Sequence, residues 1–351
     1  MIWDDFTNVY NLFEDEISKK IYEAKVNWYF KGGIDETNNI LYEYYNDSRI
    51  VGLENYNCKN VAICGAGNYG LQSYKALVHA GYKVCAFLDN DVNKVGTTLE
   101  NVEIMSFSQF VTEFNAKDIV VIIDNQRLAN MFFSELYELG FDQRKVFRTR
   151  DNIVRNIFGN IYFDLNELKH VENEIFIDAG SFNGDTTRDF LRWCGGKYKR
   201  IYAFEPMKEG YELTKKMLAD VNNISFECSA LGDKVGEAIF SKSYSGLMGS
   251  RLGNNGDSLE RVEIQTIDNV LNGDPVTFIK MDIEGAEFDA LKGGIKTLKK
   301  YKPKLAISLY HKNVDLITIP LWLRENIPEY KFYLRHYSNK KWDLVLYCVE
   351  R

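Results

Sequence analysis

The sequence predicts an α/β protein with two doubly wound parallel sheets, and two observations support this. First, an apolar strand followed by a glycine-rich turn occurs twice, at residues 61–70 and again at 175–185. Second, strands alternate with helices after each turn, as they do in parallel sheets with crossover helices. Each turn is followed one strand later by an acidic residue, Asp89 or Glu205, which can accept hydrogen bonds from ribose hydroxyls. The chain is therefore expected to contain two Rossmann-like folds.

Length, charge and cysteine usage restrict the class of protein. At 351 residues the chain is long enough for two domains with their own cores. Its net charge of −7 argues against nucleic acid as the main partner. No apolar stretch approaches the roughly 18 residues of a membrane span, and the acidic N-terminus does not resemble a signal peptide. The six cysteines form no Cys-x-x-Cys pair, so we expect reduced thiols in a cytoplasmic protein.

Residues 1–57 are predicted to form a helical N-terminal arm. Apolar residues recur at helical spacing from Phe13 to Trp28, and a second short helix is expected at 38–45. No group of catalytic side chains gathers in this segment. We expect the arm either to pack on the rest of the chain or to form a homodimer.

Residues 58–150 are predicted to form the first Rossmann-like domain. Strands are expected at 61–64, 83–88, 119–123 and 145–147, with helices at 69–80 and 131–139. Its glycine-rich turn is suited to hold a diphosphate at the helix N-terminus, and a scaffold without a ligand is the alternative. The candidate residues of this second nucleotide site are Gly65, Gly67, Asn68, Tyr69, Gly70 and Asp89.

A connector at 151–172 precedes the second domain, residues 173–351. Its strands are expected at 175–178, 200–204, 224–228, 276–281 and 304–309. One helix after Gly285 is expected to bury an apolar face made of Phe288, Leu291, Ile295 and Leu298. Two late strands, 330–337 and 344–349, lie close in sequence, which suggests an antiparallel pair that closes the sheet.

The turn of the second domain differs from a dinucleotide-binding turn, because the carboxylate of Asp178 ends the strand. A carboxylate there suits a ligand that carries an ammonium or hydroxyl group and no phosphate, and S-adenosylmethionine is such a ligand. Glu205 can accept from both ribose hydroxyls, and Ala230 and Leu231 follow the third strand, where an adenine ring would lie. A structural turn with surface carboxylates is the alternative.

Three carboxylates follow the fourth strand, and a histidine follows the fifth. Asp282, Glu284 and Glu287 are placed either to orient a substrate hydroxyl or to hold a divalent cation. Glu284 and Glu287 could also simply favour the start of a helix. His311 is a candidate general base for an alcohol, with a structural histidine as the alternative.

Five ordered blocks of this second domain resemble the FkbM family of S-adenosylmethionine-dependent methyltransferases. They are 178–186, 204–206, 280–287, Gly293-Gly294 and 304–311. The resemblance implies a class I methyltransferase fold, O-methylation of sugar or polyketide-type hydroxyls, and a position of Asp282 beside the transferred methyl group. The predicted cofactor-binding residues are Asp178, Gly180, Ser181, Phe182, Gly184, Asp185, Thr186, Glu205, Pro206, Ala230, Leu231 and Asp282.

The first domain is similar to the nucleotide-sugar-binding domains found ahead of some sugar-modifying transferases. The leading hypothesis is therefore a methyltransferase that acts on a hydroxyl of a glycan, a small molecule or a nucleotide-linked sugar. Two other hypotheses are an NAD(P)-dependent sugar-modifying oxidoreductase and a non-catalytic binding or assembly protein. The segment 241–260 is expected to be a lid over the acceptor site, with Arg335, His336 and Tyr337 on its far wall.

Overall fold

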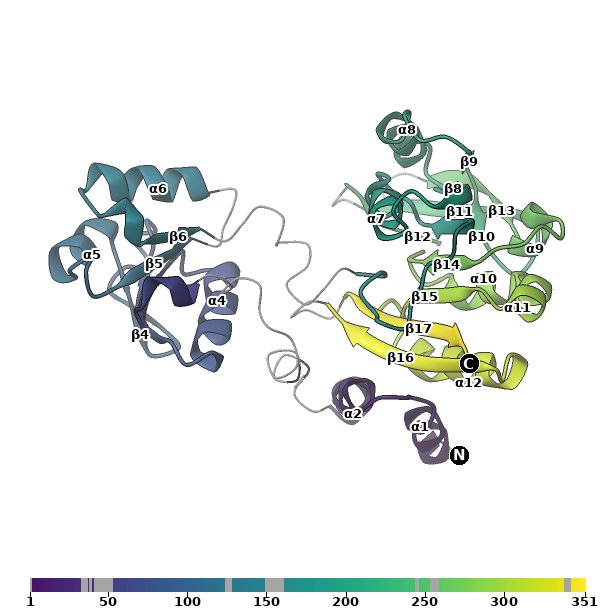
Figure 1. The fold of residues 1–351 in the computed structure, drawn as a ribbon, viewed down its shortest axis with the longest axis horizontal. Coiled ribbons are helices and arrows are strands. Elements are labelled where there is room, and N and C mark those ends of the chain that lie inside the picture. Colours follow the sequence, from purple (N-terminus) through teal and green to yellow (C-terminus); the bar gives the residue numbers. More distant parts are fainter. Residues whose placement is uncertain are drawn as a thin grey trace. The chain divides into compact units, whose positions relative to one another are not determined.

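The structure is a computed structural model that describes residues 2–32, 37, 40, 53–123, 128–148, 161–243, 246–252, 259–337 and 342–351. The chain divides into two compact units (Figure 1). One unit contains residues 1–37 and 160–351, and the other contains residues 38–159. The helix expected at 38–45 lies outside the described residues.

The unit of residues 38–159 contains a six-stranded sheet with the order β3-β4-β2-β1-β5-β6. All neighbouring strands are parallel except the pair at one edge, β3 and β4. The strands are β1 (Asn60–Cys64), β2 (Lys83–Leu88), β3 (Thr98–Leu99), β4 (Val102–Met105), β5 (Val120–Ile123) and β6 (Val146–Arg148). The helices are η1 (Leu53–Tyr56), α4 (Asn68–His79), α5 (Phe107–Glu113), α6 (Ala129–Glu138) and η2 (Gln143–Lys145).

The central strands of this sheet are buried on both faces. In β1, Val61 and Ile63 enter one hydrophobic cluster, while Ala62 and Cys64 enter another. Burial on both faces explains why these strands are continuous apolar runs, which made them predictable. The sequence analysis missed β3, β4 and α5. Helix α5 begins with a capping box, in which Ser106 and Gln109 satisfy each other's backbone N–H groups.

The other unit contains a seven-stranded sheet with the order β16-β17-β15-β14-β7-β8-β9. Strands β15, β14, β7, β8 and β9 are parallel, whereas β17 runs antiparallel to both β15 and β16. The expected fold class and the late antiparallel pair are confirmed. The strands are β7 (Glu174–Ala179), β8 (Tyr198–Phe204), β9 (Ile224–Glu227), β14 (Phe278–Met281), β15 (Lys304–Ser308), β16 (Tyr330–His336) and β17 (Leu344–Glu350).

The segment expected as one long helix after Gly285 is two helices, so that prediction is wrong. The break falls at Gly293 and Gly294, and a Cβ atom at Gly293 would lie 2.0 Å from the carbonyl oxygen of Gly232. This close approach of two backbone segments favours glycine at the last residue of α10. The helices of this sheet are α7 (Asp185–Trp193), α8 (Lys208–Met217), α9 (Ile267–Leu271), α10 (Glu287–Gly293), α11 (Ile295–Tyr301) and α12 (Asp315–Asn326).

A second, four-stranded sheet lies between β9 and β14 in the sequence and was not predicted. Its order is β10-β13-β11-β12, with β10 (Ala230–Leu231), β11 (Gly236–Ser243), β12 (Gly246–Leu252) and β13 (Leu259–Gln265). The segment 241–260 was expected to be a loop. That prediction is wrong for residues 241–243, 246–252 and 259–260, which belong to β11, β12 and β13. The side chains of Tyr244, Met248 and Arg251 lie outside the described part.

The first two helices, α1 (Ile2–Tyr10) and α2 (Glu16–Lys31), belong to the same unit as the seven-stranded sheet. Asp15 caps α2 and forms an ion pair with Arg335 of β16, with 2.5 Å between the closest atoms. Phe13 was expected inside a helix, but it lies between α1 and α2 and forms a β-bridge with Phe332. The N-terminal segment therefore packs on this sheet, and dimerisation through it stays a prediction.

The bounds of the two units differ from the domain boundaries that were expected after residues 57, 150 and 172. The first 37 residues and the residues from 160 onward form one unit. Part of the reason is Phe163, whose ring packs 6.2 Å from Phe176 and 5.6 Å from Phe278, measured between ring centroids. Among the described residues, no helix is long and apolar enough to cross a membrane.

Candidate active site

Four neighbouring strands of the seven-stranded sheet, β8, β7, β14 and β15, end at the same edge. The groups that follow these ends are Glu205, the turn 180–184, Asp282 and His311. In open α/β sheets this carboxyl edge is where ligands bind. The residues predicted from separate parts of the sequence are thus brought together by the strand order.

The turn after β7 is held in a conformation that glycine favours. Gly180 and Gly184 have φ angles of +81° and +80°, and Phe182 has a φ of +49°. A Cβ atom at Gly180 would lie 2.0 Å from the carbonyl oxygen of Asp282. Gly180 therefore lets the turn pack directly against the end of the neighbouring strand.

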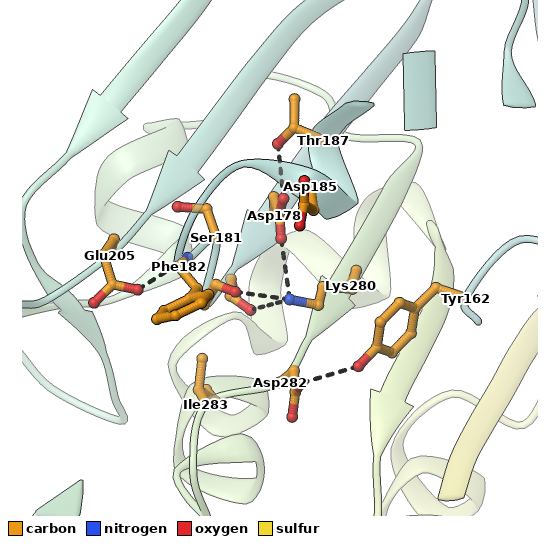
Figure 2. Close-up of polar contacts among 12 residues, drawn as sticks. Tyr162, Asp178, Ser181, Phe182, Asp185, Thr187, Glu205, Lys280, Asp282 and Ile283 are labelled. Carbon is orange, nitrogen blue, oxygen red and sulfur yellow. Dashed lines mark hydrogen bonds and ion pairs between the residues drawn. The ribbon is translucent and has the colours of Figure 1, made fainter. Parts of the chain in front are cut away.

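Glu205 ties this turn to the end of β8. Its Oε2 accepts the N–H of Phe182 at 3.0 Å (Figure 2). Its Oε1 accepts the N–H of Met207 at 3.0 Å. Burial raises the pKa of the Glu205 carboxyl, although these two hydrogen bonds and Lys280 oppose the rise. Each oxygen keeps further lone-pair capacity, so the side chain can still accept hydrogen bonds from a ligand.

Asp178 is completely buried and does not face an open site. Its carboxylate accepts the hydroxyl of Thr187 at 2.7 Å and the ammonium of Lys280 at 3.1 Å. The same ammonium donates to the carbonyl oxygens of Ala179 and Gly180. Lys280 thus fixes the beginning of the turn, and the carboxylate of Asp178 holds the Lys280 ammonium in place.

The remaining residues predicted to bind a cofactor lie in α7, in the loops after β7 and β8, and in β10. Ser181 is buried and its hydroxyl lies 3.4 Å from that of Thr214, while Asp185 accepts a hydrogen bond from Asn183 at 2.7 Å. Thr186 lies in the first turn of α7. The others are Pro206, which directly follows Glu205, and Ala230 and Leu231, which are buried in β10.

Asp282 is oriented by two tyrosines. Tyr310 donates to Oδ1 at 2.7 Å, and Tyr162 donates to Oδ2 at 3.0 Å. Burial alone would raise the pKa of Asp282, but the positive charge of Lys280, the proximity of His311 and the two hydroxyl hydrogen bonds outweigh it and lower the pKa. Asp282 is therefore an ionised carboxylate with a fixed direction.

His311 lies between carboxylates, with only 4% of its side chain exposed. Its Nδ1 is 2.9 Å from Oε1 of the fully buried Glu287. Its Nε2 is 3.6 Å from Oδ1 of Asp282 and 3.6 Å from Oε2 of Glu284. Burial lowers the pKa of His311, but the hydrogen bond to Glu287 and the three negative charges outweigh this and raise it.

Three residues of this centre were missed by the sequence analysis: Tyr162, Lys280 and Tyr310. The last two adjoin predicted residues, since Lys280 lies two positions before Asp282 and Tyr310 directly precedes His311. Tyr162 lies 120 residues from Asp282 in a segment treated as a connector. No local pattern marks it, because its role depends on a contact between distant segments.

The predicted far wall of the acceptor site is an internal part of the fold. Arg335 is bonded to Asp15 and Ser18 of the N-terminal segment. His336 is buried, with its Nε2 2.9 Å from the carbonyl oxygen of Trp342. The Tyr337 hydroxyl contacts the carboxylate of Asp164. The side chains of Arg335, His336 and Tyr337 stabilise the end of β16.

The candidate second nucleotide site, in the other unit, has a similar turn. Oδ2 of Asp89 accepts the N–H of Ala66 at 2.7 Å, and Oδ1 accepts the N–H of Asp91 at 2.9 Å. Gly67 caps α4 without a side chain. A Cβ atom at Gly70 would lie 1.9 Å from the carbonyl oxygen of Gly65. Asn68 and Tyr69 begin the helix, and Tyr69 is exposed.

The geometry of the seven-stranded unit can be compared with known protein families. Residues 178–334 match the family model of the methyltransferase FkbM domain. This segment contains Asp178, the turn 180–184, Glu205, Asp282 and His311, and it covers less than half of the chain. The match supports a methyltransferase domain in this unit. A search of the curated proteins found no match.

Solved structures show weaker likenesses. Methyltransferase FkbM from Methylobacillus flagellatus KT is 18% identical, with a TM-score of 0.49, over 95% of this chain and 99% of that chain. An rRNA methylase from Streptococcus thermophilus is 17% identical, with a TM-score of 0.34, over 51% and 87%. Fibrillarin from Aeropyrum pernix, in complex with S-adenosyl-L-methionine, is 12% identical, with a TM-score of 0.33, over 51% and 66%. At these scores the likenesses decide neither substrate nor mechanism.

Proposed function

We propose that this protein is an S-adenosylmethionine-dependent methyltransferase that acts on a hydroxyl group. The observation that carries the proposal is the convergence of Glu205, the turn 180–184, Asp282 and His311 at one edge of a seven-stranded sheet, within the segment that matches the methyltransferase FkbM domain.

The residues at this edge fit such a cofactor in most respects. Glu205 offers acceptor capacity to ribose hydroxyls, and the positive φ of Gly180 keeps the turn free of a side chain where it meets Asp282. Asp178 was expected to contact the cofactor, but its carboxylate already accepts hydrogen bonds from Lys280 and Thr187. Asp185, at the start of α7, is the remaining predicted carboxylate for an ammonium group.

Bound S-adenosylmethionine would supply an electrophilic methyl group, so that a carbon–oxygen bond forms as the carbon–sulfur bond breaks and the hydroxyl proton is lost. The chain's own task is to align the acceptor oxygen with that carbon and to help release the proton. Asp282, fixed by Tyr162 and Tyr310, and His311, fixed by Glu287, are the residues that act on this hydroxyl.

The proposed acceptor is a sugar or nucleotide-linked sugar in the cytoplasm. Its support is the resemblance of the other unit to nucleotide-sugar-binding domains. In this proposal the turn 65–70 and Asp89 bind a nucleotide within their own unit, with the N–H groups at the start of α4 facing its phosphates.

The test is transfer of a labelled methyl group from S-adenosylmethionine to a panel of sugars and nucleotide sugars. We expect a labelled methyl ether, and we expect His311→Ala to reduce turnover by roughly 10²–10⁴-fold. The matched control is His170→Ala, which removes an imidazole that packs on Trp193. Absence of label from every hydroxyl compound, or full turnover in His311→Ala, would contradict the proposal.

A further inference from the structure

Three carboxylates surround a single imidazole at the end of β14 and β15. Ligand atoms of Asp282, Glu287 and His311 all lie within 4.8 Å of one another. Glu284, whose φ is +57°, brings a further carboxylate oxygen to 3.6 Å from Nε2 of His311. One imidazole therefore faces more negative charge than its own single positive charge could balance.

The Nε2 atom of His311 is buried and has no hydrogen-bond partner among the described residues. Its nearest carboxylate oxygens, on Asp282 and Glu284, are each 3.6 Å away, which is too far for a normal hydrogen bond. A buried polar atom without a partner costs free energy, and natural structures seldom leave one. The cluster is therefore incomplete without a further group at Nε2.

Glu287 determines which nitrogen points to that position. Its Oε1 lies 2.9 Å from Nδ1 of His311, so Nδ1 carries the proton in the neutral ring and the Nε2 lone pair faces Asp282 and Glu284. Metal-binding histidines have this arrangement, with the second nitrogen bonded to a carboxylate. The two tyrosines that bond Asp282 orient that ligand in the same way.

The distances also suit a metal ion. Two ligand atoms that are each about 2.1 Å from a metal are roughly 3.0–3.4 Å apart, so a separation of 3.6 Å closes with small side-chain shifts. Asp282 and Glu284 are 28% and 33% exposed, which leaves the position open to solvent on their side. One imidazole nitrogen with two carboxylate oxygens favours a transition-metal ion over calcium.

We propose that Asp282, Glu284 and His311 bind a divalent transition-metal ion, and that Glu287 positions His311 for it. Binding of the ion does not depend on the proposed function, but its role does. With the ion bound, the acceptor hydroxyl would take an open coordination position, its pKa would fall, and its proton would pass to water as the methyl group is transferred. His311 is then a ligand, and direct proton acceptance by His311 is the competing role.

The test is a titration of the full-length, EDTA-treated protein with Co²⁺, followed by calorimetry and by the visible absorption of the bound ion. We expect one equivalent to bind, and at least about 10-fold weaker binding in His311→Ala and Glu284→Gln. Glu287→Gln should weaken binding by roughly 10–100-fold, as expected for a positioning residue. The matched controls are His170→Ala and Glu263→Gln, which should bind as the wild type does.

Far-UV circular dichroism of each variant checks that it is folded. Glu284→Gln changes only a partly exposed side chain, so it keeps the test valid if His311→Ala is misfolded. The proposal is overturned if Co²⁺ does not bind stoichiometrically, or if the variants and controls bind it equally well. Titration with S-adenosylhomocysteine separates the two proposals: cofactor binding without Co²⁺ binding overturns the metal site alone, and the reverse result overturns the proposed function alone.

Discussion

The two units share one local structure, a glycine-rich turn in which a backbone N–H donates a hydrogen bond to an acidic residue one strand later. In one unit Asp89 accepts from Ala66 at 2.7 Å, and in the other Glu205 accepts from Phe182 at 3.0 Å. They differ in what the neighbouring strands add. Beside the turn 180–184, strands β14 and β15 bring Asp282 and His311 to the same edge. In the proposed function, the turn and its acidic residue present backbone groups to the cofactor, while the side chains that act on the acceptor come from the adjacent strand ends.

The carboxylates of the two turns also differ in environment. Burial raises the pKa of Glu205. For Asp89, burial is outweighed by the N–H groups of Ala66 and Asp91 and by Lys94, so its pKa is lowered. Lys94 lies 3.3 Å from Asp89 and already neutralises it.

Asp282→Asn is expected to have the largest effect, a loss of turnover of roughly 10²–10⁴-fold, because it removes a charge that two tyrosines hold in place. Steady-state methyl transfer is the measurement. Asp118→Asn, which changes an exposed carboxylate of the other unit, is the control and should keep more than half of the activity. Comparable losses in the two variants would show that the units do not differ in the way described here.

Gly180→Ala and Gly70→Ala should each destabilise their own unit by about 1–3 kcal/mol, because each new Cβ would meet a backbone carbonyl oxygen at 2.0 or 1.9 Å. Hydrogen exchange should increase in β7 for the first variant and in β1 for the second. Only Gly180→Ala should weaken the binding of S-adenosylhomocysteine. Gly67→Ala is the control, since no atom lies within 4 Å of its added Cβ, and increased exchange there would contradict the steric explanation.

A pH-dependent effect is expected at Asp164, whose pKa is raised to about 6 by burial, against the opposing hydrogen bond from Tyr337. Between pH 4 and 6 the folded state keeps a proton that the unfolded state has lost, so the free energy of unfolding falls as pH rises through this range. Asp164→Asn should remove up to about 3 kcal/mol of this fall. Tm measured from pH 4 to 7.5 checks it, and parallel Tm profiles of wild type and variant would refute it.

Local sequence patterns predicted the strands that are buried on both faces, and the strand order explains why Glu205, Asp282 and His311 come together. Local patterns could not predict contacts between segments that are distant in the sequence. Tyr162 reaches Asp282 across 120 residues, and Gly293, the last residue of α10, lies close to the carbonyl oxygen of Gly232. The four-stranded sheet of β10 to β13 was missed as well, although residues 261–264 of β13 alternate charged and apolar side chains, which is typical of a half-buried strand.

The measurement that tests the central claim most directly is calorimetric titration of the full-length protein with S-adenosylhomocysteine. The account predicts one binding site and a loss of affinity of about 10–100-fold in Glu205→Ala, because charge-assisted hydrogen bonds to the ribose are removed. It predicts unchanged affinity in Asp89→Ala. Absence of binding at millimolar ligand, or equal affinity in wild type and Glu205→Ala, would contradict the assignment of the cofactor site to the seven-stranded sheet.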